Sequence, residues 1–195
     1  MSFPMKRLTI SAAIFAAFVT LGLAAAAQTS GSPERFTALA VNMDGGGTAT
    51  IEIVVNRWST KAERDRLMTV LLEKGPEKLL DVLQDIPKVG YFRNVNSIGW
   101  DLHYANKIAN PDGGERVVLA TDRRISFWEA RNRPRSIDYP FTVIEMRVNG
   151  DGEGEGKMSV ATKIIADKDN STITLENYGI QPVLLQSVKR QKVSH

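Results

Sequence analysis

Short runs of alternating apolar and polar residues, separated by Gly-, Asp- and Pro-rich turns, constrain the fold of this chain most strongly. The stretch 138–167 is the clearest example, because two such runs flank the Gly- and Glu-rich segment 151–156. Alternate positions of the first run hold Thr142, Ile144, Met146 and Val148 on one face, and Val143, Glu145 and Arg147 on the other. In the second run, Met158, Val160 and Ile164 share a face with Thr162. Period-two alternation predicts strands with one buried face, joined here as a long-looped hairpin.

The first 27 residues follow a different pattern. The basic pair Lys6 and Arg7 precedes an apolar segment at 8–23, and a run of alanines at 25–27 stands before Gln28. This order is typical of a secretory signal peptide. The apolar segment is shorter than the roughly 20 residues of a membrane span, and no cysteine follows it for lipid attachment. We therefore expect an exported protein, periplasmic or extracellular, with no stable membrane anchor after signal cleavage.

The length and composition of the mature chain, residues 28–195, predict a single β-rich domain with its own hydrophobic core. Loss of the two basic signal residues lowers the formal net charge from +3 to +1. The basic isoelectric point therefore gives no support to a nucleic-acid partner. The chain has no cysteine, which excludes a disulfide framework, a thiol nucleophile and a cysteine metal site.

The hydrophobic period changes to that of a helix at about 59–86. Ser59 or Thr60 can cap a first helix, and Glu63 completes a capping box with Thr60. Gly75 followed by proline ends that helix and starts a second, shorter one. The sequence therefore predicts an α-helical hairpin inserted into a β chain. Its apolar stripes are expected to pack over one open end or one face of the sheet.

The remaining runs predict a mainly β fold. Further strands are expected at 34–41, 48–58, 91–95, 100–108, 115–120, 125–129, 172–178 and 183–188. Short, successive strands favour an antiparallel barrel-like meander that closes or nearly closes, lipocalin/calycin-like in general architecture. A helix-grip fold is the second interpretation. It requires a long terminal helix, whereas residues 183–193 are β-branched and lack an amphipathic stripe.

Three segments also carry a family resemblance. The run 58–91, the sequence GWDLHYA at 99–105 and the sequence FWEARNRPRSIDYPFT at 127–142 resemble a family of uncharacterised secreted bacterial proteins that bear signal peptides. The resemblance covers most of the mature chain. Because that family has no assigned activity, the resemblance implies no functional residues.

His103 is the one histidine inside the predicted fold. A single histidine cannot build a His-rich metal site, and no G-x-S-x-G motif supplies a serine for a triad. The first interpretation of His103 is a polar strand residue. The alternative is a hydrolase or isomerase in which His103 is a base on a polar strand face with Glu52, Asp101 and Glu145. Whether that face points inward stays open.

Two charged segments could bind ligands. The basic loop around Arg131 and Arg133, next to Trp128, could hold an anion, because arginine forks suit carboxylates and phosphates. The segment 149–155 alternates oxygen-bearing side chains as calcium loops do. It lacks the glutamate at the twelfth position, where Val160 stands, so a solvated hairpin tip is the first interpretation.

The leading hypothesis is a non-enzymatic binding protein for a small, partly apolar or anionic molecule, without metal or cofactor and with no residue assigned to catalysis. An envelope protein-interaction module is a further alternative. Trp100, Tyr104 and Leu102 would share one strand face, and Arg147 would add a second cationic position. The predicted ligand-binding residues are Trp100, His103, Trp128, Arg131, Arg133 and Arg147.

Overall fold

The computed structural model describes residues 33–42, 47–94, 99–111, 113–122, 140–167, 172–177 and 181–191. The predicted signal peptide and the predicted strand at 125–129 lie outside these residues. In the described part of the chain, no helix has both the length and the apolar character needed to span a membrane.

The described residues form ten strands and two helices. The strands are β1 (Glu34–Val41), β2 (Thr48–Val55), β3 (Gly90–Asn94), β4 (Trp100–Leu102), β5 (Tyr104–Ala109), β6 (Glu115–Thr121), β7 (Phe141–Val148), β8 (Glu153–Asp167), β9 (Thr172–Asn177) and β10 (Val183–Gln191). The helices are α1 (Lys61–Lys74) and α2 (Pro76–Asp85), between β2 and β3. The mainly β composition and the inserted helical hairpin are thus as predicted. The helix-grip alternative is not supported, because the last described element is the strand β10.

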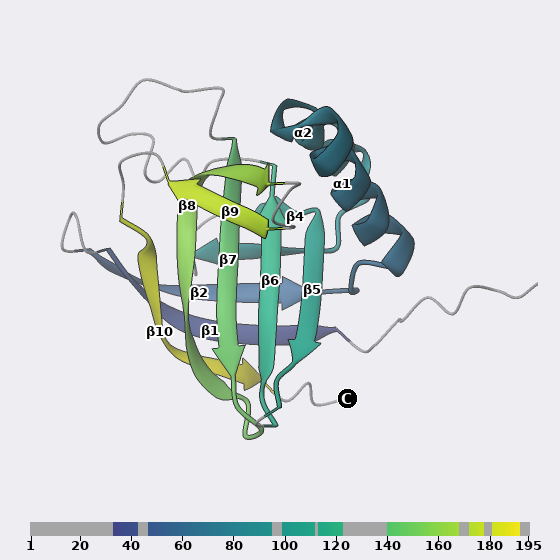
Figure 1. Ribbon diagram of the computed structural model, residues 1–195. Helices are drawn as coiled ribbons and strands as arrows, with labels where there is room; N and C mark the ends of the chain where they lie inside the picture. Colours follow the sequence, from purple (N-terminus) through teal and green to yellow (C-terminus); the bar gives the residue numbers. More distant parts are fainter. Residues whose placement is uncertain are drawn as a thin grey trace, which may run out of the picture.

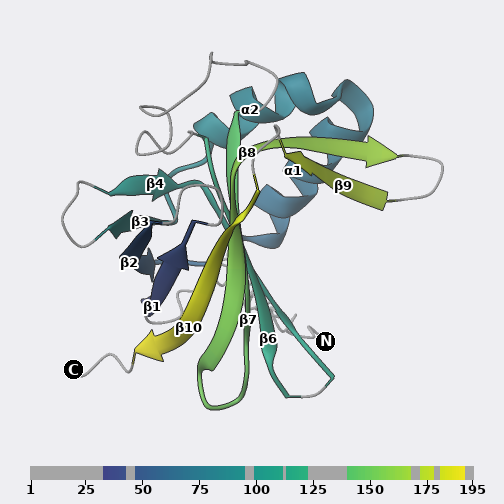
Figure 2. The same ribbon diagram turned by 90° about the vertical axis from the view of Figure 1, so that its left-hand side faces the viewer.

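All strand pairs are antiparallel and form one sheet in the order β4-β3-β2-β1-β10-β8-β7-β6-β5, with β9 added on the second half of β8. Two meanders, β1 to β4 and β5 to β8, are therefore joined by β10, which comes from the other end of the chain. Figures 1 and 2 show that the strands of one meander cross those of the other, so that the sheet is folded over on itself.

Of the two predicted forms, a meander that closes or nearly closes, the closed one is wrong, because β4 and β5, at the two ends of the strand order, do not pair with each other. They are consecutive in the chain and separated by His103 alone. Part of the free edge of β5 is taken by the segment after β2. The backbone N–H of Ser59 donates to the Ala105 carbonyl at 2.8 Å, and the Ala105 N–H donates to Ser59 Oγ at 3.0 Å. These contacts satisfy backbone groups that closure would otherwise pair.

Apolar side chains fill the space between the two halves of the sheet. The first run of the central hairpin alternates as predicted, and its inner face carries Ile144, Met146 and Val148. Further side chains with at most 1% exposure in this cluster are Phe36, Ile53, Val55, Val89, Phe92, Leu102, Ala105, Val117, Leu119, Val183, Leu185 and Val188. The polar strand face, with Glu145 and Arg147, is therefore the outer face.

The predicted continuous strand at 100–108 is wrong, because the chain turns at His103. Leu102 and Ala105 both enter the central core, although they are three residues apart. Tyr104 packs on the helical side instead. The predicted shared face of Trp100, Leu102 and Tyr104 is therefore broken. The His103 N–H donates to the Ala120 carbonyl at 3.0 Å, which fixes this corner against β6.

The central hairpin has a shorter turn than the sequence predicted. Residues Glu153 to Gly156 belong to β8, and the turn lies at 149–152. Gly154 and Gly156 allow the two backbones to approach closely. A Cβ at Gly154 would lie 1.8 Å from the Arg147 carbonyl oxygen, and one at Gly156 would lie 2.4 Å from the Glu145 carbonyl oxygen. Glycine is therefore required by packing at these strand positions, in addition to its usual place in turns.

The helical hairpin forms as its local signals predict. Thr60 Oγ1 accepts from the Glu63 N–H at 3.2 Å, and Glu63 Oε2 accepts from the Thr60 N–H at 2.8 Å. The two helices cover the outer face of the sheet near Phe141 and Val143, as expected for one face rather than the interior (Figure 1). The buried helical side chains in this second cluster are Leu67, Leu71, Leu79 and Leu83, with Ile86 directly after α2.

A charged cluster ties β1 and β10 to β5 and β6. Lys107 Nζ lies 2.7 Å from Glu34 Oε1 and 4.0 Å from Glu115 Oε1. Arg190 Nε lies 3.2 Å from Glu34 Oε2, and the Arg190 guanidinium also pairs with Glu115. Trp58 Nε1 donates to Glu34 at 3.2 Å. Each cation therefore contacts both carboxylates, which bridges strands that share no backbone ladder.

The capping box predicts a pH-dependent stability. Burial raises the pKa of Glu63, but hydrogen bonds from Arg57 and Thr60 and the charge of Arg57 outweigh it, so the pKa lies below its ordinary value of 4.5. A lowered carboxyl pKa stabilises the fold above the unfolded-state pKa, and this contribution is lost as the pH falls through the folded-state pKa. We expect Glu63→Gln to lower the unfolding free energy by about 1 kcal/mol at pH 7.

Urea denaturation at pH 7 and at pH 3 to 4 measures this effect, which should shrink at the lower pH. Glu73→Gln, at an exposed position of the same helix, is the matched control and should change little. An equal loss for Glu63→Gln at both pH values would contradict the prediction.

Candidate functional site

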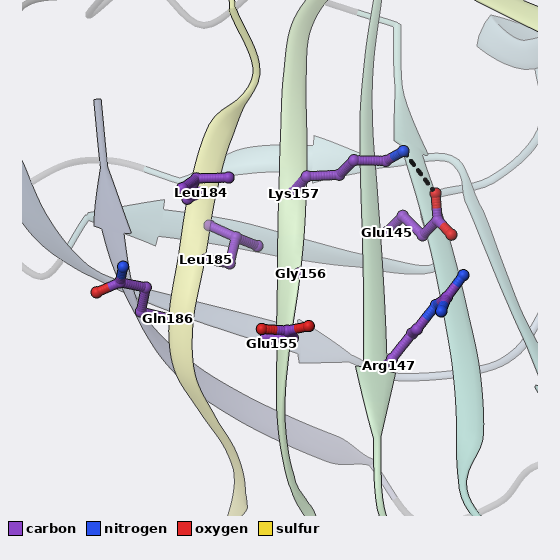
Figure 3. A pocket seen from close by; sticks show the side chains of 8 residues that line it. All are labelled: Glu145, Arg147, Glu155, Gly156, Lys157, Leu184, Leu185 and Gln186. Carbon is purple, nitrogen blue, oxygen red and sulfur yellow. Dashed lines mark ion pairs between the residues drawn. The ribbon is translucent and has the colours of Figure 1, made fainter. Parts of the chain in front are cut away.

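A groove of about 340 Å³ lies on the outer face of β7, β8 and β10. It is shown in Figure 3. The residues that line it are Glu145, Arg147, Glu155, Gly156, Lys157, Leu184, Leu185 and Gln186. Most of them belong to the polar strand face, and Leu185 is buried in the central core below. The groove is therefore a feature of the outer surface.

Strand register brings the groove residues into rows. Lys157 of β8 lies opposite Glu145 of β7 on one side and opposite Leu184 of β10 on the other. One step along the same face, Glu155 lies opposite Arg147. Directly opposed residues of an antiparallel pair have Cβ atoms about 4.5–5.5 Å apart. Apolar, cationic and anionic groups are thus collected from three strands within a small area.

A β-bulge in β10 shapes the end of the groove. Leu185 pairs with Gly156 of β8, but the next pair in the ladder joins Val188 to Gly154, so β10 contains one extra residue here. Ser187 has φ of 50°, a left-handed conformation. Bulges bend a strand and redirect its side chains. This one lies where β10 passes between the two meanders, next to Gln186 in the groove.

Glu145 is held as a carboxylate by its neighbours. Its Oε1 accepts from Arg116 Nε at 2.9 Å, and its Oε2 lies 3.4 Å from Lys157 Nζ. Burial raises the pKa of Glu145, but the charges of Arg116 and Lys157 outweigh it, so the pKa is lowered. A carboxylate engaged by two cations is a poor proton donor. Its role in the groove is electrostatic.

Arg147 and Glu155 differ from Glu145 and Lys157 in having no ion pair within the described residues, although they face each other across two strands. Figure 3 shows that the Arg147 guanidinium extends away from Glu155. Both side chains belong to exposed residues. The groove thus carries one cation and one anion that have no ion pair in the described part of the chain.

The apolar side of the groove continues onto β1. Leu184 is 38% exposed, and so is Leu39 on the outer face of β1. Leu184 lies opposite Val41, and Leu39 lies opposite Gln186. Across the sheet, the outer face therefore changes from apolar side chains on β1 and β10 to charged side chains on β8 and β7.

The sequence-predicted site residues lie in different places. Arg147 lines the groove, whereas Trp100 stacks on Phe92 with ring centroids 5.1 Å apart and packs against the central core. His103 lies at the corner between β4 and β5. The other three, Trp128, Arg131 and Arg133, lie outside the described residues.

His103 connects the helical hairpin to the sheet. Its Nδ1 lies 2.7 Å from the carbonyl oxygen of Ile86, directly after α2, and its Nε2 lies 3.8 Å from Asp122 Oδ1. The other carboxylate oxygen of Asp122 accepts from Gln84 of α2 at 3.2 Å. A carbonyl can only accept, so Nδ1 carries a proton. These contacts hold the end of α2 on the end of β6.

The polar-face carboxylates of the enzyme hypothesis belong to separate groups. Glu52 pairs with Arg35 and with Arg93, whose Nε lies 2.6 Å from its Oε2. Asp101 lies 3.7 Å from Lys88 Nζ. His103 has one carboxylate, Asp122, beside it. These contacts give no support to an acid–base site built from the predicted set.

The acidic segment 149–155 comprises the turn of the central hairpin at 149–152 and the first residues of β8. Asn149 Oδ1 accepts from the N–H groups of Asp151 and Glu153 at 3.0 and 2.9 Å. The Glu153 side chain lies 3.2 Å from Lys189 Nζ. The segment is thus a hairpin tip, as first interpreted, and the described residues contain no group of three or more His, Asp or Glu side chains suited to a metal ion.

Sequence reasoning missed Glu155, Lys157, Leu184 and Gln186. The sequence pattern places Glu155 in the turn segment 151–156 and gives Lys157 no strand face, whereas the register of β7 and β8 places Glu155 opposite Arg147. The positions of Leu184 and Gln186 depend on the pairing of β10 with β8, and no local sequence pattern predicts which strand β10 pairs with.

Comparisons with protein-family models, curated proteins and solved structures give no match to this chain.

The corner contacts predict a stability effect for His103. We expect His103→Ala to lower the unfolding free energy by about 1–2 kcal/mol, because the Ile86 carbonyl loses its partner. Urea denaturation at pH 7 provides the measurement. Asp101→Ala, two residues away on an exposed position, is the control and should change little. Equal stability of His103→Ala and the native protein would contradict the structural role of this corner.

Proposed function

We propose that this chain is an exported, non-enzymatic binding protein that holds a small, partly apolar ligand in the groove on β7, β8 and β10. The observation that carries the proposal is the groove itself, which collects the exposed Leu184 together with Arg147 and Glu155, two charged side chains that have no ion pair among the described residues. Concave sites that combine apolar surface with a few convergent polar groups are the usual form of small-molecule sites.

The ligand site differs from that of a lipocalin-like barrel. Small barrels of that kind hold their ligand inside the sheet. Here the corresponding space contains fully buried side chains such as Phe36, Phe92 and Met146. The proposed ligand therefore binds on the outer face, and Arg147 is the predicted ligand-binding residue that lies there.

Binding without catalysis is supported by the chemistry of the groove. Hydrolysis or isomerisation requires a group that exchanges a proton near neutral pH. The carboxylate of Glu145 is stabilised by Arg116 and Lys157, and the described histidine, His103, belongs to the helix–sheet corner. The groove residues can orient and neutralise a ligand, which is the chemistry of a carrier or sensor.

Export is supported by the sequence. The basic, apolar and small-residue regions of the first 27 residues, together with the absence of cysteine, are the features that favour a signal peptide followed by a lipid-free mature chain. The resemblance to secreted bacterial proteins agrees with this. We place the protein in the periplasm or outside the cell.

A protein-interaction module is the second candidate. Ile165 and Leu175, on the β8–β9 hairpin, are 37% and 39% exposed. Ile165 is opposed to Thr174 and Leu175 to Ile164, so the two side chains lie on opposite faces of the hairpin and each face offers an exposed apolar side chain to a protein partner. In that case the β8–β9 hairpin would bind the partner, and the groove would have no ligand.

Fluorescence titration with 1-anilinonaphthalene-8-sulfonate, an apolar anion, tests the binding function. We expect saturable binding by the mature protein. Leu184→Asp and Arg147→Met should each weaken it about tenfold, since one removes apolar contact and the other an ion pair. Leu175→Asp, at a leucine of nearly equal exposure, is the matched control and should bind as the native protein does.

Circular dichroism establishes that each variant is folded. Loss of binding in Leu175→Asp, with Leu184→Asp unaffected, would transfer the binding function to the β8–β9 hairpin. No saturable binding by the folded native protein would contradict the proposal for apolar anions.

A further inference from the structure

We infer that the ligand of the groove is a zwitterion with an apolar side chain, such as an apolar amino acid or a short apolar peptide with free termini. The inference rests on the proposed function, because it names the chemical class that the same groove selects. Its basis is the set of charges that the sheet leaves unpaired there.

The charges of the four charged side chains that line the groove sum to zero. Glu145 and Lys157 form an ion pair at 3.4 Å. Arg147 and Glu155 remain, one positive and one negative, with no ion pair in the described part of the chain. Glu145 also pairs with Arg116 of β6, which lies opposite Arg147. Among the side chains that line the groove, Arg147 and Glu155 are thus the two left for a ligand, with further positive charge on the side of Arg147.

A ligand with a single charge fits these two groups poorly. An anion bound by Arg147 would lie near the carboxylate of Glu155, and a cation bound by Glu155 would lie near the guanidinium of Arg147. Like charges at short range oppose binding and give selectivity. A molecule with a carboxylate and an ammonium group satisfies both side chains, and the arginine fork suits a carboxylate in particular.

The position of the apolar surface indicates the size and character of the ligand's side chain. Leu184 lies opposite Lys157, and Arg147 and Glu155 are opposed to each other in the next row of the same face, as Figure 3 shows. A volume of about 340 Å³ is at the small end of the range for ligand sites, about 300–1,000 Å³. This favours a ligand of one or two residues with an aliphatic side chain directed at Leu184.

Isothermal titration calorimetry with leucyl-leucine, its N-acetylated form and its C-terminal amide tests the inference. The acetyl form lacks the ammonium group, and the amide lacks the carboxylate. We expect the free dipeptide to bind at least about tenfold more tightly than either blocked form, as for the loss of one charged contact.

Two variants separate the contributions of the charges. Arg147→Met should weaken binding of the free dipeptide and leave binding of the amide unchanged or tighter, because the repulsion of its ammonium group is removed. Glu155→Gln should weaken the free dipeptide and leave the acetyl form unchanged or tighter, because the repulsion of its carboxylate is removed. Both positions are exposed on the outer face, so both variants are expected to fold, which circular dichroism verifies.

The outcomes distinguish the ligand class from the binding function. Equal affinity for the free and blocked dipeptides would overturn the zwitterion inference, and so would failure of the dipeptide to bind while anilinonaphthalene sulfonate binds at Leu184. Failure of both probes would overturn the inference and the proposed function together. Tight binding of the free dipeptide that is weakened by Arg147→Met and by Glu155→Gln would support both the zwitterion inference and the proposed function.

Discussion

The packed interior is the constraint on which the rest of this structure depends. The sheet folds over on itself, and its inner face is apolar on both halves, so that Phe36 and Phe92 from one half meet Leu119 and Met146 from the other in a single cluster. Interiors of this kind are close-packed. At one end of the strands the inner face also carries Glu34, Lys107, Glu115 and Arg190, and these four side chains pair with one another. The groove on the outer face is where charged side chains without an ion pair among the described residues meet the exposed Leu184.

An open sheet needs another way to satisfy its edges. The free edge of β5 receives Ser59 through two hydrogen bonds with Ala105. The cluster of Glu34, Lys107, Glu115 and Arg190 adds charge-assisted contacts between strands that share no ladder. At the other side, the chain itself joins β4 to β5 through the His103 corner. Together these contacts protect strand edges that could otherwise recruit other chains, without the regular closure of a barrel.

Features encoded locally were predictable from the sequence, and features that depend on distant strands were not. The capping box of Thr60 and Glu63 and the alternation of β7 involve neighbouring residues, so both were predicted correctly. The break at His103 depends on its hydrogen bond to Ala120, and the bulge at Ser187 depends on pairing with strands far away in sequence. The glycines of β8 suggested a longer turn, because their packing against β7 cannot be read from composition. Arg147 was predicted from its strand face, but its neighbours in the groove required the register of β8 and β10.

The central claim is that binding takes place on the outer face while the interior stays packed. Leu184 and Leu119 test it most directly, since Leu184 is 38% exposed in the groove and Leu119 is 0% exposed in the central core. Methyl NMR of the mature protein, titrated with anilinonaphthalene sulfonate, reports on both residues at once. The expected result is a saturable shift of the Leu184 methyl signals, with the Leu119 signals nearly unchanged. Larger shifts at Leu119 and at other core methyl groups would place the ligand inside the sheet and contradict the claim.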